Sequence, residues 1–171
     1  MLQYKEPIDS VHHAQHGKDL LDVPFQVLAM ASIATQQVML SEKYSVNGCQ
    51  VDLSDLINQV HQHKHSISPE MNLPFPQQEV RFAMTTVQVR NETTLMTARD
   101  MVANGKRPLV LNFANGTEVG GGFLRGARAQ EETLCYASTL YSTLVGDPFY
   151  RYNLEHAPTV STDYAILSQA V

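Results

Sequence analysis

The chain has 171 residues, of which 43% are hydrophobic and 17% are charged, and its formal net charge is −5. This composition excludes a disordered chain and gives no basic face for sequence-specific nucleic-acid binding. The chain has no apolar run of about 20 residues, which excludes a membrane-spanning helix. Its first residues do not form a signal peptide. We therefore expect a cytoplasmic protein with no membrane partner.

The cysteine and histidine patterns predict neither a disulfide framework nor a metal site. Cys49 and Cys135 are far apart and form no CxxC pair, so we expect free, buried thiols in a reducing compartment. His61, His63 and His65 form an HxHxH run at an expected helix end. Only the first and last would share a helix face, and no cysteine completes a zinc set. A solvated helix end is the favoured interpretation.

Residues 1–78 are predicted to form a helical extension. Asp22 is suited to cap a first helix that holds Pro24 in its first turn. A second helix is expected from Asp52, and prolines between 66 and 77 indicate a linker. The apolar stripe of the first helix consists of Val27, Met30, Ala31, Ala34 and Val38. That of the second helix consists of Leu53, Leu56, Ile57 and Val60.

Residues 79–171 alternate between expected strands and helices. Apolar residues over 80–89 predict a strand, and a helix over 92–104 follows, with Asn91 as its cap and Gly105 as its stop. The run PLVLNF at 108–113 predicts a short, buried strand of a parallel sheet.

After this run, a glycine-rich loop over 114–129 leads into a helix that ends at Asp147-Pro148. The run YAIL at 164–167 predicts a last strand. The order strand, helix, strand, loop, helix, strand is typical of an α/β fold.

Three consecutive glycines, Gly120, Gly121 and Gly122, lie between the expected buried strand and the expected helix. Glycines tolerate unusual dihedral angles and let a ligand approach the backbone closely. Their N–H groups can form an anion nest, and the helix N-terminus adds positive potential. The loop lacks the ends of a Walker A or GxGxxG motif. It indicates a phosphate or diphosphate site, with a simple tight turn as the alternative.

Gln130, Glu131 and Glu132 open the helix that follows the glycines. Adjacent helical residues point about 100° apart, so the two carboxylates would serve different roles. One can hold ribose hydroxyls while the other faces a glycosidic bond, whose cleavage needs a carboxyl group as acid and then as base. The alternative is that acidic residues simply favour the first turn of a helix.

The combination of these elements resembles a known family. FAN, then GGG, then QEE after a spacer of seven residues is similar to the catalytic motif of poly(ADP-ribose) glycohydrolases. LNFAN before the glycines and GARAQEETLCYASTLY after the spacer resemble the bacterial-type branch. The resemblance implies a macrodomain-like three-layer α/β/α sandwich over 79–171, with 1–78 as an N-terminal helical extension. Relatives continue past the strand that resembles YAILSQAV, so we expect a C-terminally incomplete core.

The resemblance also implies a reaction, hydrolysis of the ribose–ribose O-glycosidic bond of poly(ADP-ribose) with release of ADP-ribose, without metal or cofactor. Poly(ADP-ribose) or an ADP-ribosylated protein would be the partner, and ADP-ribose the product ligand. Glu132 would be the acid/base, Glu131 and Asn115 would hold the reacting ribose, and Gln130 would shape the loop. Gly120, Gly121 and Gly122 would wrap the diphosphate. Phe123 would pack near the sugar or close the loop.

Two other functions remain open at this point. One is a non-catalytic ADP-ribose-binding module, and the other is a hydrolase of mono-ADP-ribosyl linkages. The intact QEE favours catalysis, whereas the early end of the chain favours binding alone. Val119 stands where many relatives have proline, so we expect a looser loop with its chemistry retained. Arg125 and Arg128 either contact phosphates or are solvated.

Overall fold

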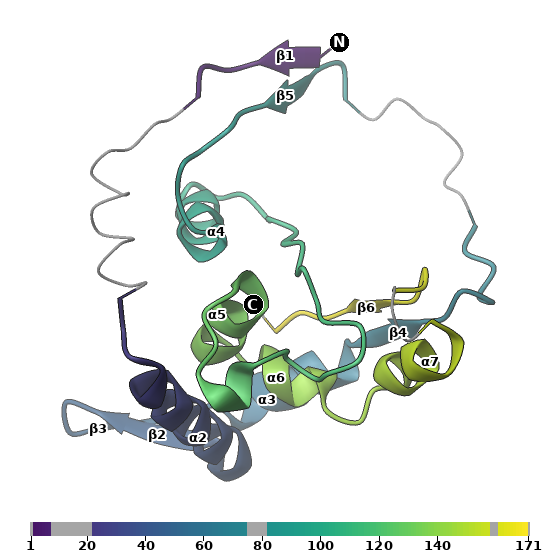
Figure 1. Cartoon of the computed structure of the whole chain (residues 1–171). Coiled ribbons are helices and arrows are strands. Elements are labelled where there is room, and N and C mark those ends of the chain that lie inside the picture. Colours follow the sequence, from purple (N-terminus) through teal and green to yellow (C-terminus); the bar gives the residue numbers. More distant parts are fainter. Residues whose placement is uncertain (1, 8–21, 75–81, 158–160, 171) are drawn as a thin grey trace. The chain divides into compact units, whose positions relative to one another are not determined.

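A computed structural model describes residues 2–7, 22–74, 82–157 and 161–170 (Figure 1). The chain forms two compact units, each built from two separate segments. Unit 1 comprises Met1–Val23 and Asn72–Val110, and unit 2 comprises Pro24–Met71 and Leu111–Val171. The functional division at residue 78 stays a prediction. No helix in the described ranges is long and apolar enough to cross a membrane.

Unit 1 pairs the start of the chain with a strand from its middle. Strand β1, Leu2–Tyr4, runs parallel to β5, Thr85–Val87, which is shorter than the predicted strand. Residue 80 of that prediction lies outside the described residues. Helix α4, Thr94–Ala103, follows and is capped by the Thr93 hydroxyl, which accepts from the Met96 N–H at 3.2 Å. Thr93 therefore takes the cap position predicted for Asn91.

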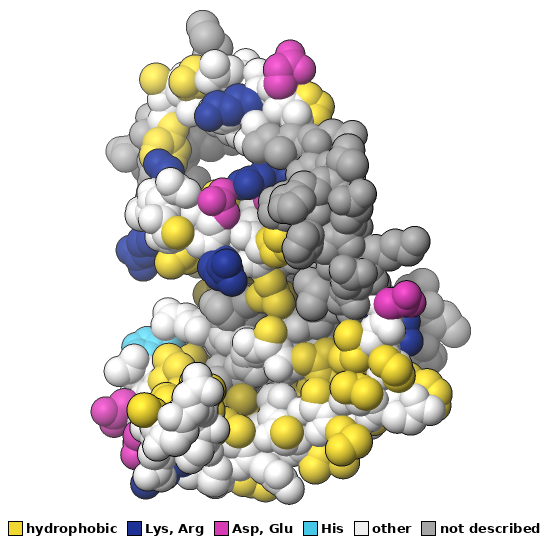
Figure 2. Space-filling view, turned by 90° about the vertical axis from the view of Figure 1, so that its left-hand side faces the viewer, with side chains coloured by type: hydrophobic (Ala, Val, Ile, Leu, Met, Phe, Trp, Pro, Cys, Tyr) yellow, Lys and Arg dark blue, Asp and Glu magenta, His cyan; other side chains and the backbone are white. Residues whose placement is uncertain are grey.

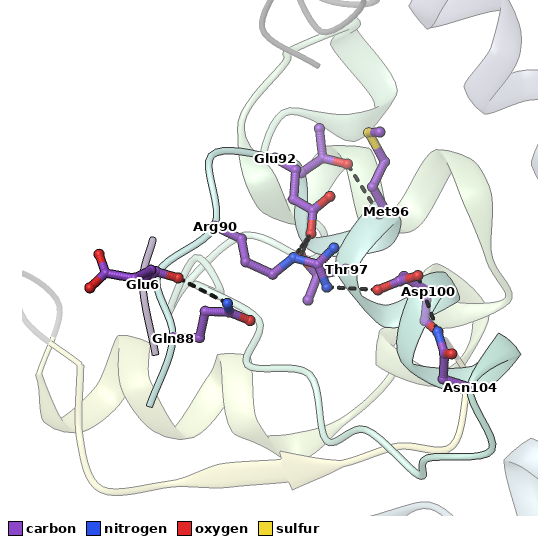
Figure 3. A network of polar contacts seen from close by, with 9 residues as sticks. Glu6, Gln88, Arg90, Glu92, Met96, Thr97, Asp100 and Asn104 are labelled. Carbon is purple, nitrogen blue, oxygen red and sulfur yellow. Dashed lines mark hydrogen bonds and ion pairs between the residues drawn. The ribbon is translucent and has the colours of Figure 1, made fainter. Parts of the chain in front are cut away.

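A polar network fixes the segment before α4 to the helix itself (Figure 3). The Arg90 guanidinium lies 2.5 Å from Glu92 and 2.7 Å from Asp100. The Thr97 hydroxyl donates to Glu92 at 2.7 Å. Helix α4 ends where predicted, because Gly105 adopts φ 70° and donates its N–H to the Val102 carbonyl.

Unit 2 begins with helix α2, Phe25–Ser41, which packs on α5 and on the short 3₁₀ helix η1, Phe123–Arg125. Pro24 occupies the N-cap position and no side chain caps the helix, so the predicted Asp22 cap is wrong. The predicted apolar stripe is wrong as well, since Val27 and Met30 are 51% and 70% exposed.

The buried face of α2 carries small residues instead, with Ser32 fully buried. A Cβ on Gly126 would lie 2.0 Å from the Phe25 carbonyl oxygen. The backbone at Gly126 therefore packs directly on the backbone of α2, which leaves no room for a side chain at Gly126. Larger apolar side chains of α2 such as Ile33 and Leu40 are exposed instead. Hydrophobic side chains gather on the lower part of Figure 2, the side on which α2 and the β2–β3 hairpin lie in Figure 1.

A hairpin interrupts the stretch that was predicted to be helical. Strand β2, Lys43–Val46, pairs antiparallel with β3, Cys49–Asp52, through Asn47 and Gly48, whose φ angles are 50° and 77°. Two central residues with positive φ are typical of a tight hairpin turn. Cys49 is exposed on this hairpin, which corrects the prediction of a buried thiol.

Helix α3, Ser54–Gln62, begins two residues later than predicted, because the Asp52 carboxylate accepts from the Ser54 N–H at 3.0 Å. Its inner face buries Ile57 and Val60, as predicted, whereas Leu56 is 48% exposed. The strand that follows, β4 (His65–Ile67), places His65 outside the helix, so the HxHxH run is not presented on one helix. This strand also occupies the start of the predicted linker.

Strand β6, Ala165–Leu167, confirms the last predicted strand and pairs antiparallel with β4. By contrast, the predicted buried strand at 108–113 is wrong. No described strand pairs with it, and Leu109, Leu111 and Phe113 are 85%, 70% and 72% exposed. The run crosses the boundary between the two units, and a strand needs a neighbouring strand to satisfy its backbone.

The single helix predicted between the glycine loop and Asp147-Pro148 is two helices, and a third helix that was not predicted begins at its expected end. Helix α5, Gln130–Ala137, ends at the extended residue Ser138, and α6, Leu140–Leu144, follows. Asp147-Pro148 starts α7, Pro148–His156, because the Asp147 carboxylate caps the Phe149 N–H at 3.0 Å. The core of unit 2 centres on this helical part and contains Phe123, Leu134, Cys135, Leu140, Leu144 and Phe149.

Candidate functional site

The three glycines form a tight loop whose conformation requires glycine. Gly120 and Gly121 adopt φ 64° and 58°, a region that other residues rarely adopt. The Gly121 N–H donates to the Glu118 carbonyl at 3.0 Å, and the Phe123 N–H to the Gly120 carbonyl at 3.1 Å. The loop thus bends back on itself and leads into η1.

Glu132 lies directly against this loop. Its side chain is buried, and Oε1 accepts a hydrogen bond from the Gly122 N–H at 2.7 Å. A Cβ on Gly121 would lie 2.5 Å from the same oxygen, so the carboxylate occupies space that only a glycine leaves free. Its other oxygen, Oε2, is buried without a hydrogen-bond partner in the described part of the chain. Such an oxygen is costly unless a ligand meets it.

Glu131 is hydrogen-bonded to the segment before the glycines. Its side chain is buried, Oε2 accepts from the Asn115 N–H at 2.8 Å, and Oε1 accepts from the Asn112 amide at 3.4 Å. Burial raises the pKa of Glu131, and the hydrogen bonds from Asn115 and Asn112 oppose that rise. The two adjacent carboxylates therefore have different hydrogen-bond partners, and their separate roles stay a prediction.

The raised pKa of Glu131 gives a test by pH. Because the folded state binds this proton more tightly than the unfolded state, its contribution to stability is complete below the ordinary pKa of 4.5. That contribution is lost as pH rises through the raised value. Thermal unfolding of the parent and of Glu131→Gln should therefore show the parent's relative stability falling over the range above pH 4.5. A constant difference over that range would contradict the protonation argument.

The side chain of Gln130 binds the backbone of the segment before the loop. Its side-chain amide donates to the Leu111 carbonyl at 2.7 Å, and its carbonyl oxygen accepts from the Phe113 N–H at 2.9 Å. This bidentate contact takes up the backbone groups that a neighbouring strand would otherwise bind. The predicted role of Gln130 in shaping the loop stays a prediction.

Asn115 organises the turn before the glycines. Its side-chain oxygen accepts from the N–H groups of Thr117 and Glu118, both at 2.9 Å. The backbone N–H of Asn115 is bound to Glu131, so the residue links the turn to one carboxylate. If Asn115 contacts a ribose, the side-chain amide nitrogen is the group left to do so.

Phe123 closes the loop from within. Its ring is fully buried, with ring centroids 5.0 Å from Tyr136 and 4.6 Å from Tyr141. The Tyr136 hydroxyl lies 3.0 Å from the Phe123 carbonyl oxygen and can donate to it. Of the two roles left open by the sequence, the structure favours closing the loop, so a ligand would meet only the backbone of Phe123.

Two side chains near the carboxylates were missed by the sequence analysis. Asn112 contacts Glu131, and its position just before FAN was the signal that could have revealed it. Tyr150 on α7 has a buried hydroxyl, and burial raises its pKa, which the backbone N–H of Gly120 opposes. The electrostatic influence of Glu131 adds to that rise. No local pattern marks Tyr150, because α7 itself was not predicted.

Cys135 lies on α5 between the carboxylates and the core. Burial, together with Glu131 and Glu132, raises the pKa of its thiol to about 12. Cys49 is exposed. A thiol reagent at about pH 8 should therefore label one cysteine of the native protein, Cys49, and both after unfolding. Peptide mapping checks the position, and labelling of Cys135 before unfolding would contradict the described packing.

A glycine loop that touches one of two buried glutamates at a helix start defines a class of α/β site. The helix start at such a loop can bind a phosphate group, and a carboxylate beside it can act as an acid or a base. A family model, that of the microbial-type poly(ADP-ribose) glycohydrolase (PARG) catalytic domain, matches residues 32–171. The chain belongs to this family.

Solved structures agree with the family match. Poly(ADP-ribose) glycohydrolase from Thermomonospora curvata is similar with a TM-score of 0.68 and 28% identity, over 84% of this chain and 54% of that chain. The same enzyme bound to the inhibitor ADP-HPD is similar with a TM-score of 0.66 and 26% identity, over 84% and 53%. The chain thus spans about half the length of these structures. No curated protein sequence matches it.

These similarities confirm the predicted fold class, a mixed helix-and-sheet protein of the macrodomain-like type. Within the described residues, the strands form three two-stranded sheets, which is a partial view of that fold.

Proposed function

We propose that the chain hydrolyses the ribose–ribose O-glycosidic bond of poly(ADP-ribose) and releases ADP-ribose, with Glu132 as general acid/base. The observation that carries the proposal is the environment of Glu132. One oxygen is fixed by the Gly122 N–H at 2.7 Å, and the other is buried without a partner in the described residues. Membership of the glycohydrolase family supports the choice of substrate.

The diphosphate of the substrate would bind at the glycine loop. The N–H groups of Gly121 and Gly122 already donate to the Glu118 carbonyl and the Glu132 carboxylate. These two glycines would therefore help binding only by letting the diphosphate approach the backbone closely. The first turn of α5 would then meet the charge, since a helix start leaves N–H groups outside its own hydrogen-bond ladder.

The chemistry would follow from the two carboxylates. Glu132 donates a proton to the departing ribose oxygen and then takes a proton from the attacking water. Glu131 and Asn115 hold hydroxyls of the reacting ribose, and the negative potential of the site stabilises the positive charge that develops at the anomeric carbon. These steps use only the chain's own residues and water.

Incubation of purified chain with poly(ADP-ribose), followed by chromatography of the products, tests this function. Release of free ADP-ribose is the expected result. If the folded chain binds ADP-ribose without releasing it from the polymer, the activity is wrong and a binding module takes its place. Release only from mono-ADP-ribosylated protein would instead indicate hydrolysis of that linkage.

The proposal extends to the partner and the compartment. Poly(ADP-ribose) attached to protein would be the natural partner, and ADP-ribose the product ligand. Cys49 and Cys135 are both free, which suits a reducing compartment such as the cytoplasm. Cell fractionation with an antibody against the chain would test this location.

A further inference from the structure

An ion pair bridges the two ends of the triple-glycine loop. Glu118 precedes the glycines and Arg125 follows them, in η1. The two Arg125 terminal nitrogens each meet a different Glu118 oxygen, with the Nη2–Oε2 contact at 2.8 Å. Parallel contacts of this kind fix orientation as well as distance. The side chains thus join the residues on either side of Gly120, Gly121 and Gly122.

The pair is exposed, which limits what it can contribute to global stability. The side chains of Arg125 and Glu118 are 66% and 45% exposed. Exposed ion pairs generally add little to the free energy of unfolding. The bidentate contact between Arg125 and Glu118 is therefore better explained by an effect on the local loop conformation than by an effect on global stability.

The local role follows from what lies between the two residues. Three glycines have the largest backbone freedom to lose on ordering. Val119, the one residue between Glu118 and the glycines, has no ring to restrict φ. The last glycine, Gly122, donates its N–H to Glu132. Restraining the loop therefore restrains the hydrogen bond that orients the carboxylate.

We propose that Glu118 and Arg125 are a positioning pair, which holds the glycine loop in the conformation that orients Glu132. The inference rests on the proposed function for its effect on rate, but its effect on the loop is independent of any substrate. Neither residue is itself the acid or base. In the free protein Arg125 is paired with Glu118 and is not an unpaired cation that waits for a phosphate.

The test uses four variants and a matched control in the full chain. Glu118→Gln and Arg125→Gln each break the pair, and the double variant E118R/R125E rebuilds it with reversed charges. Val119→Pro in the E118Q background supplies a backbone restraint in its place, and no described hydrogen bond uses the Val119 N–H. The control is Arg151→Gln, which breaks an exposed Arg–Glu pair on α7.

Two measurements are made. Amide hydrogen exchange of Gly122 in the unliganded protein reports on the loop, and kcat/KM for ADP-ribose release reports on the reaction. Both single variants should speed Gly122 exchange and lower kcat/KM by about two- to fivefold, the usual range for breaking an exposed pair. The charge reversal and Val119→Pro should both restore the parent values. R151Q should change neither.

The outcomes separate this inference from a simple charge effect and from the proposed function. If Arg125 acted only by attracting an anionic substrate, R125Q would lower kcat/KM, E118Q would raise it, and reversal would not rescue. That pattern, or unchanged exchange in both single variants, overturns the positioning role. If the parent releases no ADP-ribose while exchange follows the expected pattern, the glycohydrolase assignment fails and the positioning pair stands.

Discussion

Replacing Glu132 with glutamine is expected to lower ADP-ribose release from poly(ADP-ribose) by about 10²- to 10⁴-fold, with the fold intact. Glutamine keeps an oxygen for the Gly122 N–H, which contacts Oε1 at 2.7 Å in the parent. It cannot give a proton to the leaving oxygen or take one from water. The loss should therefore fall on kcat, while affinity for ADP-ribose changes little.

A distant glutamate provides the control for this prediction. Glu155 lies on α7, is about half exposed and pairs with Arg151, so Glu155→Gln changes the same charge away from the loop. It should leave the rate at the parent level. Steady-state kinetics and ADP-ribose titration calorimetry measure rate and binding separately. An E132Q rate within tenfold of the parent would move the acid/base role to another group, with Glu131 as the next candidate.

A candidate site could be proposed from the sequence because its parts are close together in the chain. Glycines and the acidic start of a helix are local signals, and the contact from Gly122 to Glu132 spans only ten residues. Backbone freedom and the helix start depend on short segments. The sequence alone could not show what Gln130 and Phe123 contact. In the structure the Gln130 side chain binds the Leu111 carbonyl, and the Phe123 side chain is fully buried.

The parts that failed depend on contacts between distant segments. Helical spacing identified α2 but not its buried face, because Gly126 approaches the α2 backbone at Phe25 and Ala29, a contact that the spacing within the helix does not reveal. The apolar run at 108–113 has the composition of a buried strand, yet a strand forms only where a neighbour pairs with it. Asn112 contacts Glu131, which is 19 residues away in the sequence. Helix and strand periodicity do not relate two residues at that separation.

The second large effect is expected from adding one methyl group, Gly121→Ala. The alanine would have to adopt φ 58°, and its Cβ would lie 2.5 Å from Glu132 Oε1 and 3.1 Å from Glu131 Oε2. The loop or both carboxylates must therefore move. Because displacement of a reacting group by about 1 Å can cost roughly 100-fold in rate, we expect kcat/KM to fall by at least about tenfold.

Backbone strain alone must be separated from this collision, and Gly146→Ala does so. Gly146 has a similar φ of 74°, but a Cβ there would meet nothing within 4 Å. Both alanines should lose about 1–2 kcal/mol of unfolding free energy from the left-handed conformation. Only G121A should also lose activity. Equal activity of the two variants would mean that the carboxylates tolerate the methyl group, and that contact with Gly121 does not set the position of Glu132.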